Sequence, residues 1–192
     1  SRLCKVAPVV SLYGGFFSVA LARTGKVDRL IGVTHGLEYG EERGVVPVGG
    51  GIPVPKYYFP TLHIRLHARD AYRAIRSLKG FESAEGFFTR VCGCTECRRV
   101  IQRAPENDFL NYARTRPIPM TRRGQQLVIE YPLPETKNHC VRHYMWSKHR
   151  EYSEEFSLQR VFDEFRQAES KLGRVLGLSS TGHCRTWREL LA

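Results

Sequence analysis

The sequence contains no hydrophobic run long enough to cross a membrane, and its first residues lack the layout of a signal peptide. Its six cysteines do not follow an even disulfide pattern, because three of them cluster in one short segment. We therefore expect a cytoplasmic protein with reduced thiols and no membrane contact. At 192 residues, 42% of them hydrophobic, the chain can bury one sizeable core.

Acidic residues are scarce relative to basic ones. The 30 Lys+Arg and 19 Asp+Glu residues give a net charge of +11. The excess is mostly arginine, which pairs with phosphate in bidentate geometry. This predicts a polyanionic partner, nucleic acid first; the alternative is that the charge only keeps the protein in solution. DNA and RNA are not distinguished, because arginine and aromatic side chains serve both.

The clustered cysteines Cys92, Cys94 and Cys97 lie in residues 91–97, which we call the knuckle. A C-x-C-x-x-C spacing places three thiolates, which are soft metal ligands, on one tight turn. Gly93 allows the backbone to turn sharply between the first two. A disulfide between Cys92 and Cys94 would be strained, and three is an odd number for pairing. The knuckle predicts one structural Zn²⁺ per chain; three reduced structural thiols are the alternative.

A fourth zinc ligand is expected from a long helix over residues 138–172, with Asn138 as its N-cap. Its first turns carry His139, Cys140 and His143, and residues four apart share one helix face. His143 is preferred, because it lies one turn inside the helix, where the backbone is best held. Candidates further along the chain are His149 and the pair His183 and Cys184.

The first part of the chain reads as a βαβ unit. A buried strand is predicted at 6–12, a helix at 16–22 that ends near residues 24–25, and a second strand at 30–34. The two strands should be parallel neighbours. Ligands of parallel α/β sheets bind beyond the carboxyl ends of the strands. Residues 11–15 and 34–41 follow these ends, so they are predicted to bind a flat ligand or a phosphate, or else to form an exposed polar loop.

The rest of the chain is predicted more coarsely. An extended loop is expected at 44–60, whose aromatic and basic residues at 56–59 either pack under the loop or contact phosphates and bases. We further predict a helix from Asp70 to about residues 79–80, a short helix from Arg98, a strand at 126–131 in an irregular region, and a last helical turn at 187–191. The predicted division is into residues 1–88, the βα units, and 89–192, the zinc-binding subdomain.

A C-x-C-x-x-C knuckle after a βαβ unit, followed by a histidine at the head of a long helix, resembles the C-terminal end of the tRNA-guanine transglycosylase family. The likeness is closest to the branch that inserts 7-deazaguanine bases into DNA. The matching positions are Cys92, Cys94, Cys97 and residues 143–146. Residues 11–17 and 35–41 are similar to the last barrel strands and their loops. The resemblance covers most of the chain.

The resemblance implies an α/β fold that is the C-terminal portion of a (β/α)8, TIM-like barrel, with a zinc-binding knuckle and a long C-terminal helix. It implies an enzyme that exchanges guanine for a 7-deazaguanine base in DNA or tRNA, through an aspartate nucleophile and a glycosyl-enzyme intermediate. Zinc would be structural. A complete barrel takes about 250 residues, so an N-terminal part or a partner chain would have to complete this one.

The family carries an aspartate at the end of a late barrel strand. This sequence has none there, since residues 30–33 read Leu-Ile-Gly-Val. Glu38 and His35, in the following loop, are the catalytic candidates that remain, and the chain alone is not expected to be active. The substrate-binding candidates are the residues of both strand ends that permit close approach or stacking: Gly14, Gly15, Gly36 and Tyr39. The alternative function is a zinc-stapled nucleic-acid-binding protein without chemistry. A metal-dependent hydrolase would require an open zinc position, which three thiolates and a histidine close.

Overall fold

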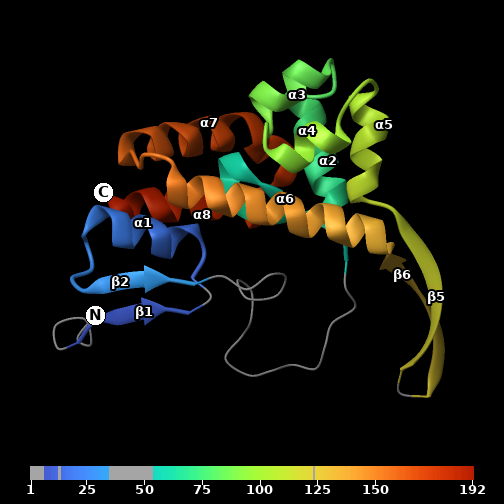
Figure 1. Cartoon of the computed structure of the whole chain (residues 1–192), viewed down its shortest axis with the longest axis horizontal. Helices are drawn as coiled ribbons and strands as arrows, with labels where there is room; N and C mark the ends of the chain where they lie inside the picture. Colours follow the sequence, from blue (N-terminus) through green and yellow to red (C-terminus); the bar gives the residue numbers. More distant parts are fainter. Residues whose placement is uncertain (1–6, 13, 35–53, 123) are drawn as a thin grey trace.

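The computed structural model describes residues 7–12, 14–34, 54–122 and 124–192 (Figure 1). The candidates His35, Gly36, Glu38 and Tyr39 lie outside the described residues, and so does most of the loop predicted at 44–60. Their roles stay predictions.

The predicted βαβ unit is confirmed. Strand β1 (Val9–Ser11), helix α1 (Phe16–Thr24) and strand β2 (Leu30–Val33) follow one another, and β1 pairs with β2 in parallel. Helix α1 ends where expected, because Gly25 takes the left-handed conformation with φ of 65°. The helix packs against β2 and α8 at the lower left of Figure 1.

The end of the predicted loop is instead a buried hairpin, so the loop boundary at residue 60 is wrong. Strand β3 (Lys56–Phe59) pairs antiparallel with β4 (Ile64–His67) across the 3-10 turn η2 (Pro60–Leu62). Tyr57, Tyr58 and Phe59 are fully buried. The strand is covered by α2 and α6, and these helices bury the aromatic side chains that the sequence places after a glycine- and proline-rich stretch.

Four short helices and a 3-10 turn follow: α2 (Ala68–Ser77), α3 (Ala84–Arg90), α4 (Thr95–Val100), α5 (Pro105–Phe109) and η3 (Leu110–Tyr112). The predicted helix from Asp70 is confirmed as α2, and the chain leaves it at Lys79, which has φ of 57°. The short helix expected at Arg98 begins three residues earlier, at Thr95. The knuckle thus lies between α3 and α4.

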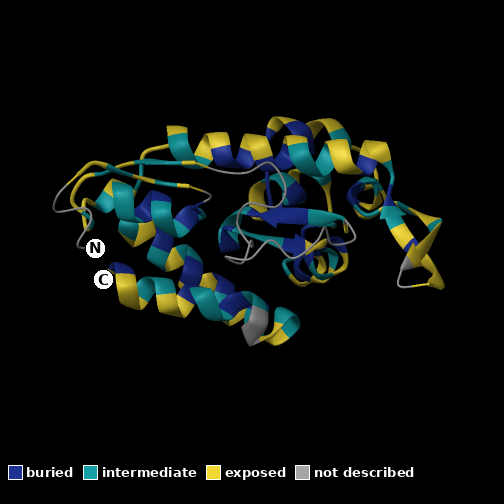
Figure 2. Ribbon diagram, turned by 90° about the horizontal axis from the view of Figure 1, so that it is seen from below, coloured by how far each residue is buried: buried dark blue, intermediate teal, exposed yellow. Residues whose placement is uncertain are grey.

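A two-stranded ribbon projects from the helical body (Figure 1). Strands β5 (Thr115–Arg122) and β6 (Gln125–Pro132) pair antiparallel. The strand predicted at 126–131 is confirmed as β6, whereas the first strand was expected to be irregular because of Pro117 and Pro119. Both strands of a two-stranded ribbon are edge strands, where proline is tolerated. Figure 2 shows the ribbon, at the right, with mostly exposed residues.

Three helices complete the chain: α6 (Pro134–Ser153), α7 (Leu158–Leu176) and α8 (Leu178–Leu191). The single helix predicted over 138–172 is wrong, and so is its N-cap at Asn138, because α6 begins at Pro134 after the N-cap residue Leu133. Glu154 leaves the helical conformation, with ψ of 151°, and the Ser157 side chain caps α7 by accepting a hydrogen bond from Arg160 N. The predicted last turn at 187–191 belongs to the longer helix α8.

The described residues form a mixed α/β structure with three two-stranded sheets, and they contain no closed barrel. The core lies between α1, β3, α2 and the C-terminal helices, where buried residues face inward (Figure 2). Among the described helices, none is long and apolar enough to span a membrane. The completion of a barrel by other strands stays a prediction.

Candidate metal centre

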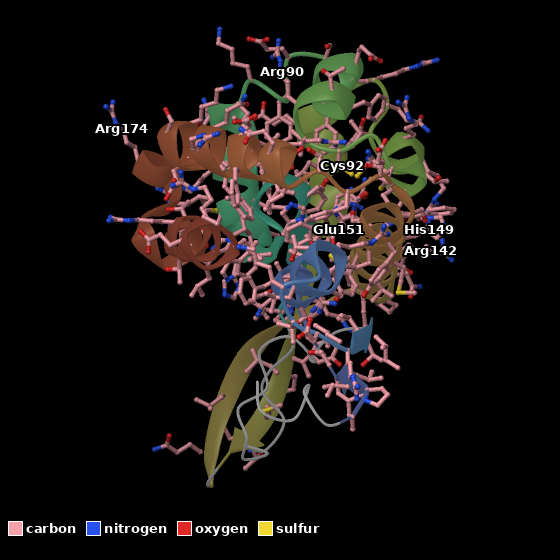
Figure 3. The ribbon with its side chains drawn as sticks, turned by 90° about the vertical axis from the view of Figure 1, so that its left-hand side faces the viewer. Arg90, Cys92, Arg142, His149, Glu151 and Arg174 are labelled. Atoms are coloured by element: carbon pink, nitrogen blue, oxygen red, sulfur yellow. The ribbon has the colours of Figure 1, made fainter. Side chains whose placement is uncertain are left out.

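Four buried side chains bring their ligand atoms within 4.8 Å of one another: Cys92, Cys94, Cys97 and His143. Nδ1 of His143 lies 3.3 Å from Cys94 Sγ, 3.4 Å from Cys97 Sγ and 4.0 Å from Cys92 Sγ. Tetrahedral bonds of about 2.3 Å to sulfur and about 2.0 Å to nitrogen would separate these atoms by roughly 3.5 Å. The donor types and their spacing therefore suit a metal ion such as zinc. Figure 3 shows Cys92 beside the green helices between which the knuckle lies.

The knuckle is held by the start of α4. Cys94 is the N-cap residue of this helix, and its sulfur accepts a hydrogen bond of 3.4 Å from Cys97 N. The φ of Gly93 is not positive, so the backbone freedom of glycine, which was expected to permit a sharp turn here, is not what this position requires. A Cβ at this position would lie 3.2 Å from Arg98 Nη2 and 3.3 Å from the Phe88 carbonyl oxygen. Close packing requires the glycine instead.

The fourth member of the cluster, His143, is fully buried on α6. Its Nε2–H donates a hydrogen bond of 2.7 Å to the carbonyl oxygen of Tyr58 on β3. Its ring stacks on Tyr57, with centroids 4.1 Å apart. Because Nε2–H is bonded to a carbonyl oxygen, Nδ1 is the ring nitrogen that faces the three thiols, and its lone pair becomes available to a metal once Nδ1 loses its proton. A backbone acceptor behind a metal-binding histidine fixes both its tautomer and its orientation.

Two phenols contact the cluster from outside. The hydroxyls of Tyr57 and Tyr112 lie 3.3 Å and 3.6 Å from Cys97 Sγ. Burial, followed by repulsion from the Cys97 sulfur in its ionised form, raises the pKa of both phenols well above the ordinary value, so they remain protonated and can donate to a thiolate. The sequence offered Tyr57 as a stacking platform or packing residue and gave no sign of either phenol's contact with sulfur.

Without a metal, the cluster holds a proton on the histidine. Hydrogen bonds from Cys94 and Cys97 lower the pKa of Cys92 well below its ordinary value. Burial opposes a charged His143, but hydrogen bonds and attraction from Cys92 and Cys94 outweigh burial and raise its pKa to about 10. Burial raises the pKa of Cys97. Metal binding must therefore displace protons from both the imidazole and the thiols.

The other proposed ligands have different partners. Nδ1 of His139 lies 2.7 Å from the buried Glu96, which also binds Arg99. The Cys140 thiol donates to the Tyr112 carbonyl oxygen at 3.6 Å. His149 is exposed at the outer edge of α6 (Figure 3). His183 and Cys184 lie on α8, where His183 Nε2–H donates to the Leu62 carbonyl oxygen at 2.8 Å.

The two described substrate-binding candidates lie at the start of α1. Gly14 is buried, and a Cβ there would lie 2.6 Å from both Ser11 Oγ and Ser18 Oγ. Gly15 is the N-cap residue of α1 and has free space around its Cα. Packing alone accounts for Gly14. A role in ligand binding stays a prediction for both.

Comparison of the chain with protein-family models, with curated proteins and with solved structures finds no match. The function therefore has to be argued from the chain's own residues and their geometry.

Proposed function

We propose that this chain is the structural-zinc and nucleic-acid-docking part of a guanine transglycosylase-like enzyme, which exchanges guanine for a 7-deazaguanine base in DNA or tRNA. The observation that carries the proposal is the buried Cys3His cluster. Its three cysteines come from the predicted knuckle, and its histidine comes from the middle of the long helix α6, later in the chain, which is the order of the resemblance. Three thiolates and one imidazole complete a tetrahedral shell, which is typical of a structural zinc.

Zinc in this cluster would join parts of the chain that are distant in sequence. The knuckle supplies three ligands, α6 supplies His143, and β3 holds His143 through the Tyr58 carbonyl oxygen. The helices α4 and α6 also pack directly on one another. The ion would therefore fix the knuckle on the helical body, and its chemistry would be structural.

Nucleic-acid docking is supported by exposed basic residues around this centre. They lie on α4, on the chain just after it, at the base of the ribbon and on α6: Arg98, Arg99, Arg103, Arg114, Arg116, Lys137 and Arg142. Figure 3 shows Arg142 at the outer edge of the molecule. Arg99 is engaged by Glu96, with Nη2 2.6 Å from Oε1, and Arg98 Nε donates to the Gly93 carbonyl oxygen at 3.0 Å, so these two contribute less to a phosphate site. Phosphate contacts of this kind make affinity strongly dependent on salt.

The alternative is a zinc-stapled nucleic-acid-binding protein without catalysis. It is favoured by the three small sheets and the lack of a closed barrel among the described residues. In this case the exposed basic residues would still bind a polynucleotide, and no base exchange would occur with any partner chain.

A binding experiment tests the docking role. Zinc-loaded protein is titrated with double-stranded DNA and with tRNA at several salt concentrations. Arg142→Gln should lower the slope of log K against log salt by roughly one unit if the arginine contacts one phosphate of a duplex. Arg174→Gln is the matched control, because Arg174 lies on α7 at the opposite edge of Figure 3 from Arg142, and it should leave the slope unchanged. Affinity that does not depend on salt would contradict the docking role.

A base-exchange assay separates the two functions. Labelled 7-deazaguanine is offered with DNA or tRNA, with and without a candidate partner chain. Incorporation that requires the partner, and that is lost in Glu38→Gln or His35→Gln, supports the enzyme. Polynucleotide binding without incorporation under any of these conditions supports the binding protein.

A further inference from the structure

The ribbon formed by β5 and β6 has two outer edges. It projects from the helical body (Figure 1), and no third strand of the described chain pairs with it. A free strand edge exposes backbone N–H and C=O groups that can pair with another strand. The hydrogen-bonding pattern of the ribbon determines which residues expose these groups.

This pattern is set at the base of the ribbon. Leu133 N donates a hydrogen bond of 3.1 Å to the Arg114 carbonyl oxygen, one step beyond the pair Thr115–Pro132. Opposed residues of an antiparallel pair alternate between hydrogen-bonded and non-hydrogen-bonded positions, and the backbone N–H and C=O groups of the latter point outward. On β5 the outward residues are Thr115, Pro117, Pro119 and Thr121, and on β6 they are Gln126, Val128, Glu130 and Pro132.

The two outer edges differ in their donors. Pro117 and Pro119 have no N–H, so the middle of the β5 edge cannot donate to another strand. On β6, Gln126, Val128 and Glu130 keep both groups, and no described carbonyl oxygen outside the ribbon accepts from their N–H groups. Proline, charge and bulges protect the exposed edges of natural sheets. The middle of β6 has no proline and no bulge, so this edge is open to another strand.

The side chains of β6 favour a further strand as well. Val128 is 73% exposed, more than any other large hydrophobic residue that the structure describes. On the opposite face of the strand, Leu127 is 39% exposed beside the buried Ile129. A two-stranded hairpin by itself is only marginally stable in water. A strand added to β6 would cover both exposed residues and widen the sheet.

We propose that β6 pairs with β6 of a second copy of this chain, in antiparallel orientation about a two-fold axis at Val128. Gln126 then lies opposite Glu130 of the second copy, and Val128 lies opposite its own counterpart. These are hydrogen-bonded pairs, so the outward N–H and C=O groups of both strands are satisfied. A two-fold axis makes the same edge complementary to itself.

The side chains match in this register. On one face, the Gln126 amide donates to the Glu130 carboxylate of the second copy, so no like charges oppose one another. On the other face, Leu127 lies opposite Ile129 of the second copy, which forms an apolar cross-strand pair. The match of charge and of apolar residues favours a second copy over a strand of unrelated sequence.

The prolines of β5 limit the assembly to two chains. In the resulting four-stranded sheet, β5 of each copy forms an outer edge, and Pro117 and Pro119 remove the donors from the middle of that edge. A third copy has no open edge on which to pair. The product is therefore a closed dimer and not a filament, with the two helical bodies at opposite ends of the sheet.

Sedimentation velocity of the zinc-loaded full chain, freed of nucleic acid, tests the pairing over a roughly hundredfold range of concentration. We expect an equilibrium between monomer and dimer that shifts to dimer as concentration rises. Each chain carries a net charge of +11, so added salt should strengthen the dimer, whereas it weakens association bridged by residual nucleic acid. A monomer at every concentration, or growth beyond the dimer, would overturn the proposal.

Two proline variants locate the interface. Val128→Pro removes the N–H at the two-fold axis but no hydrogen bond of the ribbon, because Val128 lies opposite Pro119 in a non-hydrogen-bonded pair. We expect the Kd of the dimer to rise roughly tenfold or more. Thr121→Pro makes the same change at an outward position of β5 and should leave the Kd unchanged. An unchanged Kd in Val128→Pro would overturn the pairing.

Two cysteine variants report on the register without the conformational effect of proline. The backbones of the two Val128 residues would lie about 5.5 Å apart, within reach of a short bismaleimide. The two Thr121 residues would be separated by both copies of β6, out of its reach. We expect cross-linked dimers in Val128→Cys and none in Thr121→Cys or the wild type. No cross-linking in Val128→Cys, or equal cross-linking in both variants, would overturn the register.

The pairing involves neither the metal centre nor nucleic acid, so its failure is distinct from failure of the proposed function. Zinc content and DNA binding are measured on the same preparations. A monomeric wild type that keeps both properties overturns only the pairing. A dimer that has neither property overturns only the proposed function.

Discussion

At the level of single residues, the cluster depends on contacts that fix each ligand before any metal arrives. His143 is held between the Tyr57 ring and the Tyr58 carbonyl oxygen, and Cys94 is held by the first turn of α4. A side chain already in place loses little conformational entropy when it binds an ion. Tyr58 also contacts Glu151, through its side-chain hydroxyl.

A glycine pair tests the packing of the knuckle. In Gly93→Ala the new Cβ would press on the Phe88 carbonyl oxygen at 3.3 Å, so we expect a loss of stability of about 1–3 kcal/mol. Gly173→Ala on α7 meets no atom within 4 Å and should raise stability by about 0.5–1 kcal/mol through helix propensity. Urea unfolding of the zinc-loaded proteins measures both. A stabilising Gly93→Ala would show that the knuckle has room for a side chain.

The buried Glu151 predicts a specific dependence of stability on pH. Burial opposes its charge, but hydrogen bonds and attraction from His63, Lys148 and Tyr58 outweigh burial and lower the pKa of Glu151 below the ordinary 4.5. Because the folded-state pKa is depressed, the carboxylate stabilises the fold fully above pH 4.5, and this contribution is lost as the pH falls below that value.

Urea unfolding of the wild type and Glu151→Gln over this pH range measures the contribution. At neutral pH the variant should be less stable by about 3–5 kcal/mol, because the buried Lys148 loses the carboxylate that lies 3.0 Å from its Nζ. The difference should shrink as the pH falls below 4.5. Glu155→Gln, which changes an exposed carboxylate nearby, is the control. Parallel curves for wild type and Glu151→Gln would contradict the assignment.

At the level of elements, the break between α6 and α7 places both helices in the wall of one cavity of about 810 Å3. Ser157 caps α7, so Ser157→Ala should cost about 0.5–2 kcal/mol. Ser153→Ala, at the end of α6, removes exposed hydrogen bonds to the His149 carbonyl oxygen and ring, and should change stability by less than about 0.5 kcal/mol. Thermal unfolding compares the two. Equal effects would mean that the cap does not fix the break.

These elements also show what sequence can predict here. The knuckle follows from local spacing, and the βαβ unit follows from strand and helix patterns that are close in the chain. Local spacing left His139, Cys140 and His143 as alternatives, and the preference for His143 rested on a helix start at Asn138, whereas α6 begins at Pro134. The break at residues 154–157 contains neither proline nor glycine, and its only local sign is the capping serine. Strand β3 follows a stretch that reads as loop, so its burial depends on α2 and α6. The contact between His63 and Glu151 joins residues 88 positions apart, which no local pattern reveals.

At the level of the whole molecule, the metal centre connects the knuckle with the helical body, so metal removal should act on some elements and spare others. After chelation, amide hydrogen exchange in α3, α4 and the first turns of α6 should rise roughly tenfold or more. Helix α1 packs on β2 and α8, away from the cluster, and should change little. Mass spectrometry after exchange resolves these segments. Uniform change in all helices would show that the ion stabilises the entire fold, and no change would show that it stabilises none.

The most direct test is the zinc content of protein purified without added metal. We expect about one zinc ion per chain in the wild type and in Cys140→Ser, whose thiol is half-buried near the cluster and donates to a carbonyl oxygen. Cys94→Ser and His143→Ala should lose most of the zinc together with part of their folding stability. Full zinc content in His143→Ala, or no zinc in the wild type, would contradict a structural Cys3His centre and remove the main support for the transglycosylase-like function.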